Sequence, residues 1–234
     1  MKYHILLLLA CFTMWSVPQI AIGQSDSASN SSLEIVINAY PVFNSLVADQ
    51  QFKSEIDVNG AFGFGSDVSL ALNKGPWRIE LGIGYGNIKL GHKQRGLIFG
   101  SDIDPSIGII STSTIDYDID IGVLSVPFEV GYTLFRESFG LVVSPGLSWN
   151  YVLANNSNVI INYGNGQSAP SNSTLDLGTS MIAVTLGAGK QFSLKDRLNL
   201  VIEPKMNYYL RDHFVSNSKI LSFALQYGLS YRLN

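Results

Sequence analysis

The sequence has almost no cysteine. Among its 234 residues the single cysteine is Cys11, within an N-terminal segment that we expect to be removed on export. A mature chain without cysteine can form neither disulfide bonds nor a thiolate metal site. This composition suits an exported bacterial protein that avoids oxidation in the periplasm.

Charge is scarce as well. Charged residues make up 14% of the chain and the net charge is only -3, whereas charged residues form about a quarter of an ordinary globular protein. The sequence therefore has no basic footprint for a nucleic acid and no sign of a site for acidic substrates. With 46% hydrophobic residues, the chain is also too apolar to be disordered.

Long apolar runs are missing beyond the N-terminus. Lys2 precedes an uncharged, leucine-rich stretch over residues 5–17, and the small-residue stretch 21–23 follows Pro18 and Gln19. This pattern predicts a signal peptide over residues 1–23, cleaved near Gly23 or Gln24. Residues 24–32 are rich in serine and read as a flexible polar lead-in.

Two alternatives remain for the N-terminal segment. It is an uncleaved anchor if its apolar run spans a membrane, although that run is short. It is a lipoprotein signal if residues 8–11 (Leu-Leu-Ala-Cys) are the cleavage box, although hydrophobic sequence continues well past Cys11.

Alternation of apolar and polar residues with period two fills the rest of the chain. It is clearest over residues 221–233, where every second residue is large and apolar. Strand geometry puts the two sets on opposite faces. The same pattern occurs over residues 33–43, 62–72, 77–85, 126–134, 139–153, 182–189 and 198–210. This predicts about eight strands, which approach or exceed the ~9–11 residues that a tilted membrane strand needs.

The two strand faces differ in a way that indicates a membrane barrel. The apolar face is bulky and nearly free of charge, whereas the other face mixes glycine, serine and asparagine with charged residues. A soluble barrel would have a charged exterior instead. We therefore predict an all-β fold over residues 33–234: a transmembrane antiparallel up-and-down β-barrel. The predicted lumen charge network comprises Arg78, Glu80, Glu129, Glu203, Lys205 and Arg232.

Connections of alternating length support this prediction. Short turns are expected at residues 73–76, 136–138 and 194–196. Long loops are expected near residues 44–58, 94–113 and 155–176, with a shorter one near residues 212–218. Outer-membrane barrels have short periplasmic turns and long extracellular loops.

Three segments resemble a known family. Residues 124–132 (LSVPFEVGY), 202–208 (IEPKMNY) and 227–233 (YGLSYRL) are similar to the outer-membrane β-barrel domain common in Bacteroidetes-type bacteria. The resemblance covers roughly residues 33–234 and implies location in the cell outer membrane, mostly without an assigned activity. This chain ends in Leu233-Asn234, whereas many outer-membrane barrels end in phenylalanine.

No enzyme or cofactor motif emerges from the sequence. Asp116, Asp118 and Asp120 share one face, but their spacing does not require a common calcium ion. His92 and His213 are candidates for a lipid-modifying enzyme, yet neither has a recognisable triad. We therefore predict no catalytic residue, no cofactor and no metal site.

The leading functional hypothesis is a non-enzymatic outer-membrane protein with a structural or surface-interaction role. Its partners would be outer-membrane lipid, the barrel-assembly machinery and an extracellular ligand at loops 94–113 and 155–176, with no nucleic acid. The alternatives are a small porin-like channel, a lipid-modifying outer-membrane enzyme and, more distantly, a soluble lipocalin-like carrier.

Overall fold

A computed structural model describes most of the chain after the predicted lead-in. The described residues are 31–47, 56–97, 103–104, 109–110, 113–134, 140–171, 178–210 and 219–233. The predicted signal peptide and most of the polar lead-in lie outside them, as does His213. Within these residues, no helix is long and apolar enough to cross a membrane.

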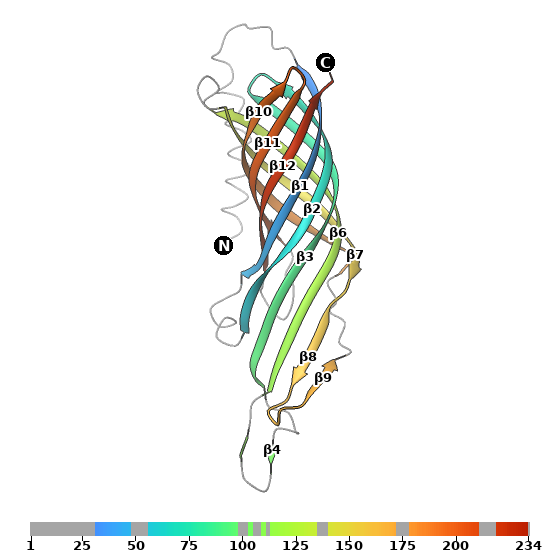
Figure 1. Cartoon of the computed structure of the whole chain (residues 1–234), viewed down its shortest axis with the longest axis vertical. Coiled ribbons are helices and arrows are strands. Elements are labelled where there is room, and N and C mark those ends of the chain that lie inside the picture. The colour runs from blue at the N-terminus through green and yellow to red at the C-terminus, as the bar shows by residue number, and fades with distance from the viewer. Residues whose placement is uncertain are drawn as a thin grey trace, which may run out of the picture. The chain divides into compact units, whose positions relative to one another are not determined.

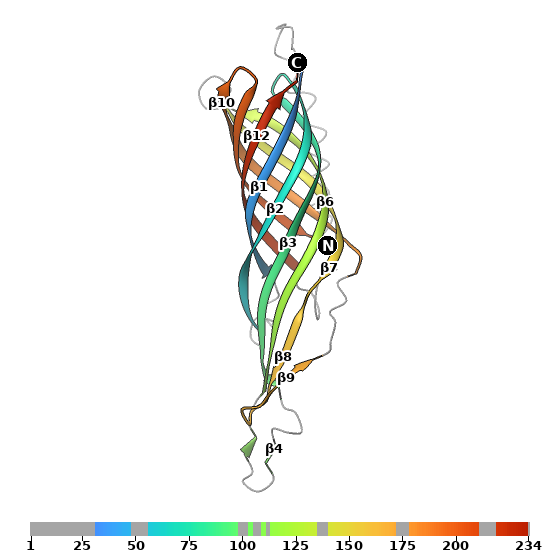
Figure 2. The same cartoon turned by 45° about the vertical axis from the view of Figure 1, so that its right-hand side comes forward.

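Eight antiparallel strands form a hydrogen-bonded ring (Figures 1 and 2). Each strand pairs with its neighbours along the chain, and β1 pairs with β12 to complete the ring. The eight strands are β1 (Ser32–Val47), β2 (Ile56–Lys74), β3 (Trp77–Leu97), β6 (Ser113–Leu134), β7 (Leu141–Asn155), β10 (Ser180–Lys195), β11 (Leu198–Tyr209) and β12 (Lys219–Arg232). The predicted antiparallel up-and-down barrel is confirmed.

One end of the ring carries tight turns, and we call it the turn end. Gly75 lies in the turn between β2 and β3 with φ of 61°, a conformation that glycine adopts without steric cost. Two backbone hydrogen bonds of 2.8 Å lie at this end. The Arg232 amide donates to the Arg197 carbonyl in the turn between β10 and β11, and the Leu233 amide donates to the Leu33 carbonyl across the ring closure. The turn end is therefore held together by main-chain contacts.

The opposite end extends beyond the ring, and we call this part the extension. Strands β3 and β6 are 21 and 22 residues long, about twice the length that crosses a bilayer. The short strand β8 (Asn158–Asn162) pairs with β6, and β9 (Ser168–Ser171) pairs with β8 (Figure 1). Two further short strands, β4 (Ile103–Asp104) and β5 (Ile109–Ile110), pair with each other.

The extension revises the predicted loops. The sequence predicted strands only over residues 77–85 and 126–134, whereas β3 continues to Leu97 and β6 begins at Ser113. The predicted loop 155–176 contains β8 and β9. Period-two alternation continues through these segments, because Ile88 and Leu90 on β3 lie opposite Ile121 and Ile119 on β6.

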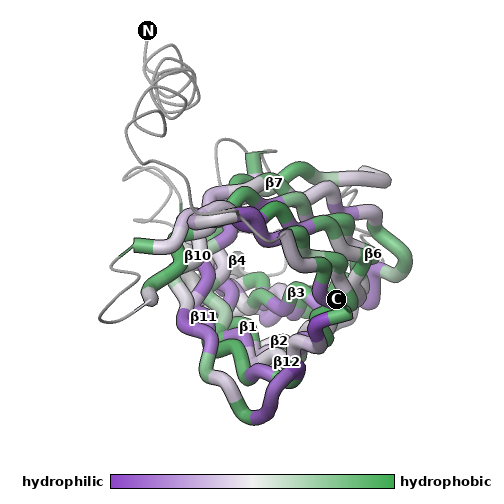
Figure 3. Tube along the Cα trace, turned by 90° about the horizontal axis from the view of Figure 1, so that it is seen from above, coloured by the Kyte–Doolittle hydropathy of each residue, from purple (hydrophilic) through white to green (hydrophobic). Residues whose placement is uncertain are grey.

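Large apolar side chains cover the outside of the ring between the turn end and the extension. Phe62 on β2 is 72% exposed, Ile37 on β1 is 58% exposed and Leu81 on β3 is 55% exposed. Figure 3 shows hydrophobic and hydrophilic residues alternating around the ring. An apolar surface this extensive is stable in hydrocarbon, and the closed ring leaves no strand edge unpaired there.

The chemical character of the two faces reverses along β3 and β6. Near the turn end Leu81 and Phe128 face outward, whereas Glu80 and Glu129 face inward. In the extension Lys89 and Asp120 lie outside, whereas Ile88, Leu90, Ile119 and Ile121 are buried inside. The exposed apolar surface of β3 ends at Tyr85. The reversal therefore marks one boundary of the membrane, and the extension lies outside the bilayer.

A charge placed on the apolar band tests this boundary. Leu81→Arg puts a cation on the lipid-facing side of β3 and should cost about 2–4 kcal/mol of unfolding free energy. Urea titration of the barrel refolded in lipid vesicles measures this loss. Lys89→Arg, on the outer face of the same strand above the boundary, is the matched control and should change stability little. Equal losses at the two positions would contradict the assigned boundary.

Candidate functional site

A layer of buried ion pairs crosses the lumen near the turn end. Arg78 on β3 contacts Glu34 on β1 at 3.2 Å and Glu80 on its own strand at 2.8 Å. Ser69 on β2 donates a hydrogen bond to Glu80, and Ser230 on β12 donates one to Glu34 at 2.6 Å. Side chains from four strands therefore meet around one guanidinium group.

A second ion pair lies further along the lumen. Lys205 on β11 contacts Glu129 on β6 at 2.7 Å; the Glu129 side chain is buried, and that of Lys205 is 12% exposed. Asp67 on β2 accepts a hydrogen bond at 2.7 Å from the side-chain amide of Asn38 on β1. Buried ions of this kind are tolerated only when they are paired and hydrogen-bonded.

Glycine makes room for one of these acidic side chains. Glu203 on β11 lies over Gly187 and Gly189 of the neighbouring strand β10. A Cβ atom at position 189 would lie 2.8 Å from the Glu203 Cβ atom, which is too close. The Gly-x-Gly pattern here therefore serves packing inside the narrow barrel.

The structure places the six sequence-predicted lumen residues unequally. Arg78, Glu80, Glu129 and Lys205 form the ion pairs described above. Glu203 lies beside them, whereas Arg232 is at the rim, half-exposed, with its Nε atom 3.7 Å from Glu34.

Sequence reasoning left two members out of this network, Glu34 and Asp67. Alternation had already put both on the polar faces of their strands. However, neither residue has a charged neighbour within its own strand, so nothing in the sequence linked them to Arg78 or Lys205.

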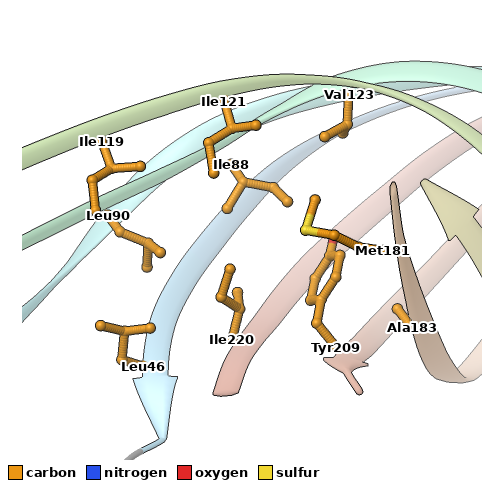
Figure 4. Packing of buried hydrophobic residues seen from close by; sticks show 10 residues of the cluster. All are labelled: Leu46, Ile88, Leu90, Ile119, Ile121, Val123, Met181, Ala183, Tyr209 and Ile220. Carbon is orange, nitrogen blue, oxygen red and sulfur yellow. The ribbon is translucent and has the colours of Figure 1, made fainter. Parts of the chain in front are cut away.

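An apolar layer crosses the ring at the end where the extension begins. Figure 4 shows its side chains converging from several strands of the ring. The layer consists of Leu46, Ile88, Leu90, Ile119, Ile121, Val123, Met181, Ala183, Tyr209 and Ile220. Each large aliphatic side chain buried in this way contributes roughly 1.5–3 kcal/mol. The layer is therefore a packed core, and the polar lumen predicted from the sequence does not continue through it.

A cavity of about 80 Å³ lies between the charged layers and the apolar layer. Glu80, Glu129 and Lys205 line it on the charged side, whereas Ile88 and Val123 line it on the apolar side. The described part of the lumen thus contains a polar cavity between the charged layers and the apolar layer. Nothing in this arrangement provides an open path along the barrel axis through the described residues.

The outer face of the extension carries cross-strand ion pairs. Lys89 on β3 contacts Asp120 on β6 at 3.2 Å, and Lys93 contacts Asp116 at 3.4 Å. Two of the three aspartates considered for calcium, Asp116 and Asp120, therefore have lysine partners. Within the described residues, no group of three or more acidic, histidine or cysteine side chains is arranged to hold a metal ion.

His92 lies on the inner face of the extension. Its ring stacks on Tyr117 of β6 with 4.1 Å between the ring centroids and 11° between the planes. Burial lowers the pKa of His92 from 6.5 to about 4, because the imidazolium ion loses its hydration. His92 is therefore neutral near pH 7 and packs as an aromatic ring. This placement does not suit a general base acting on membrane lipid.

Comparison with known proteins shows a likeness of fold alone. No family model matches the sequence, and no curated protein matches it. Among solved structures, Neisserial surface protein A is 13% identical, with a TM-score of 0.41 over 84% of this chain and 96% of that one. The Yersinia pestis protein Ail, solved with the heparin analogue sucrose octasulfate, is 15% identical, with a TM-score of 0.38 over 85% of this chain and 99% of that one.

A third solved structure extends the same comparison. The outer-membrane protein AlkL, studied in lipid bilayers, is 13% identical, with a TM-score of 0.40 over 91% of this chain and 94% of that one. These structural neighbours are small outer-membrane β-barrel proteins. Independently of them, the closed ring and the apolar outer band give this chain the architecture of an outer-membrane barrel. The narrower resemblance to the Bacteroidetes-type domain stays a prediction.

Two arginines that contact the same carboxylate test the buried charge layer. Arg78→Met leaves Glu34 and Glu80 without their buried cation and should cost about 3–5 kcal/mol of unfolding free energy. Arg232→Met removes the half-exposed cation from Glu34 and should cost under about 1 kcal/mol. Urea titrations of both variants in lipid vesicles measure the difference. Similar losses in the two variants would show that the contribution of Arg78 to stability does not depend on its burial.

Acidification tests the packing of His92. The unfolded segment binds a proton near pH 6.5, but the folded one binds it only near pH 4. The contribution of neutral His92 to the stability of the extension is therefore fully present above pH 6.5 and is lost as the pH falls toward 4. Over that range the equilibrium constant for local opening should rise by up to about tenfold per pH unit. Hydrogen-exchange protection factors of β3 and β6 amides around His92 measure this effect.

The matched variant for this experiment is His92→Phe, which keeps a ring against Tyr117 but cannot bind a proton. Its protection factors should not change between pH 7 and pH 5. The amides of β12 provide an internal reference away from the extension. A wild-type extension that is equally protected at both pH values would disprove the role of His92.

Proposed function

We propose that this chain is an outer-membrane barrel that acts at the cell surface through its extension. The observation that supports this proposal is the reversal of the strand faces, which carries β3, β6, β8 and β9 beyond the apolar band. The lipid-facing band would contact outer-membrane lipid, and the barrel-assembly machinery would insert the chain. The turn end would then face the periplasm.

The extension has the features of an interaction surface. Its outer face carries charged pairs, and the turn between β8 and β9 presents Tyr163, Asn165 and Gln167. Asn165 organises this turn by accepting a hydrogen bond at 3.0 Å from the Gln167 amide. Long extracellular segments on a rigid barrel are common sites of binding. We infer a structural or adhesive role with an extracellular ligand and no catalytic step.

The alternative functions receive less support from the geometry. A channel needs a continuous polar path, whereas the apolar layer around Ile88 and Ile121 crosses the lumen. A lipid-modifying enzyme needs a reactive group facing lipid, whereas His92 points inward. His213 lies outside the described residues.

Trimming the extension tests the proposed function. In the trimmed chain, Asn-Gly joins His92 to Tyr117, and a four-residue Gly-Ser turn replaces residues 156–177. A strain lacking the protein is complemented with the full or the trimmed chain. Cell aggregation, attachment and binding to immobilised extracellular proteins and glycans are then measured. The trimmed chain should keep heat-modifiable gel migration, because the ring and the apolar layer remain, but should lose surface binding.

Conductance provides the control for this experiment. Neither the full nor the trimmed chain should conduct above background in planar bilayers, because both keep the packed layer. If the trimmed chain restored every surface phenotype, the interaction role would be wrong. Conductance from the full chain would favour the channel instead.

A further inference from the structure

The cavity in the lumen has an acidic wall. Asp67, Glu80 and Glu129 line it, against the single cation Lys205. Arg78 compensates Glu80 at 2.8 Å, and Lys205 compensates Glu129 at 2.7 Å. Asp67 instead is hydrogen-bonded to two neutral groups, the side-chain amide of Asn38 and the hydroxyl of Tyr40. The wall therefore holds one carboxylate more than these ion pairs balance.

The wider lumen has the same imbalance. The carboxylates that face it are Glu34, Asp67, Glu80, Glu129 and Glu203, and the cations are Arg78, Lys205 and Arg232. Five acidic groups face three basic ones, and one of the three lies at the half-exposed rim. An uncompensated negative charge inside a barrel surrounded by lipid is costly.

Buried polar atoms around the cavity also lack partners. The Thr185 hydroxyl oxygen and the Asn44 side-chain nitrogen have no hydrogen-bond partner among the described residues, although both residues line the cavity and are at most 4% exposed. Buried groups of this kind are normally satisfied by a ligand or by ordered water.

We propose that the cavity binds a monovalent metal cation of the Na⁺ or K⁺ class. Asp67 supplies the charge, and the Thr185 hydroxyl oxygen is a neutral ligand or a partner of the cation's water. The Asn44 amide donates to a water molecule in the same shell. A cavity of about 80 Å³ has room for an ion with a few waters.

A divalent ion fits this site less well. Calcium takes six to eight oxygen ligands, several of them from carboxylates, and magnesium requires a near-octahedral set. Within the described residues, the acidic side chains do not converge in groups of three. The spread of single carboxylate, hydroxyl and amide groups suits a weakly coordinated, partly hydrated monovalent ion.

The test compares the stability of the full barrel in different salts. The protein is refolded in phosphocholine vesicles at pH 8, with NaCl, KCl or choline chloride at the same ionic strength, and is unfolded with urea. Choline is a bulky cation whose charged nitrogen is covered by alkyl groups, so these oxygen ligands cannot coordinate it. At a metal-ion concentration about ten times the dissociation constant, the folded-to-unfolded ratio should be about tenfold higher than in choline.

Two isosteric variants locate the effect. Asp67→Asn removes the charge from the cavity wall and should abolish the difference between NaCl or KCl and choline chloride. Asp120→Asn removes the same charge from the outer face of the extension and should keep that difference. In crystals soaked with thallium(I), an anomalous-scattering peak should appear beside Asp67, which gives a direct measurement even if Asp67→Asn fails to fold.

Several outcomes would overturn the proposal. Equal stability of the wild-type barrel in all three salts would show that the chamber holds water or protons only. A salt difference that persists in Asp67→Asn would place the cation elsewhere, as would a thallium peak away from the cavity. The salt comparison is independent of the extension, so its failure would leave the proposed surface role untouched.

Discussion

The hydrogen bonding of the backbone inside hydrocarbon is the constraint on which this structure depends. Lipid offers no donor or acceptor to an unpaired amide or carbonyl group, so strands can cross a membrane only in a closed ring. The pairing of β1 with β12 meets this requirement by joining residues almost 200 positions apart in sequence. Once the ring is closed, alternate side chains must face either lipid or a narrow interior, and the remaining architecture follows from that division.

The division also explains why the fold was predictable from the sequence whereas its interior layers were not. A period of two assigns each side chain to a face, so the outward positions of residues such as Phe62 and Tyr227 followed from alternation alone. Alternation does not say how strands are staggered. The meeting of Glu34 with Arg78 depends on the packing of β1 against β2 and β3, which lies beyond any single strand.

The extension illustrates a different limit. The sequence around Ile88 and Ile121 alternates as clearly as the membrane segments do, but with apolar residues on the opposite face. The predicted strands, residues 77–85 and 126–134, stopped short of these residues, and the predicted loop near residues 94–113 did not include them. The signal was nevertheless present: Asp116, Asp118 and Asp120 share one face, with Ile119 and Ile121 on the other. When the alternation continues but the apolar residues change from the outer to the inner face, the pattern indicates a strand that leaves the membrane.

The reversal also connects the structure to the function it supports. Below the boundary, lipid solvates the outside and the lumen holds the polar groups. Above it, water solvates the outside, so the interior becomes an ordinary apolar core that seals the barrel. The same residues that stabilise the extension, Leu90 and Ile119 among them, therefore close the lumen. The strands that build the surface outside the membrane thus also supply the apolar layer across the lumen, and the cavity with its acidic groups lies on the membrane side of that layer.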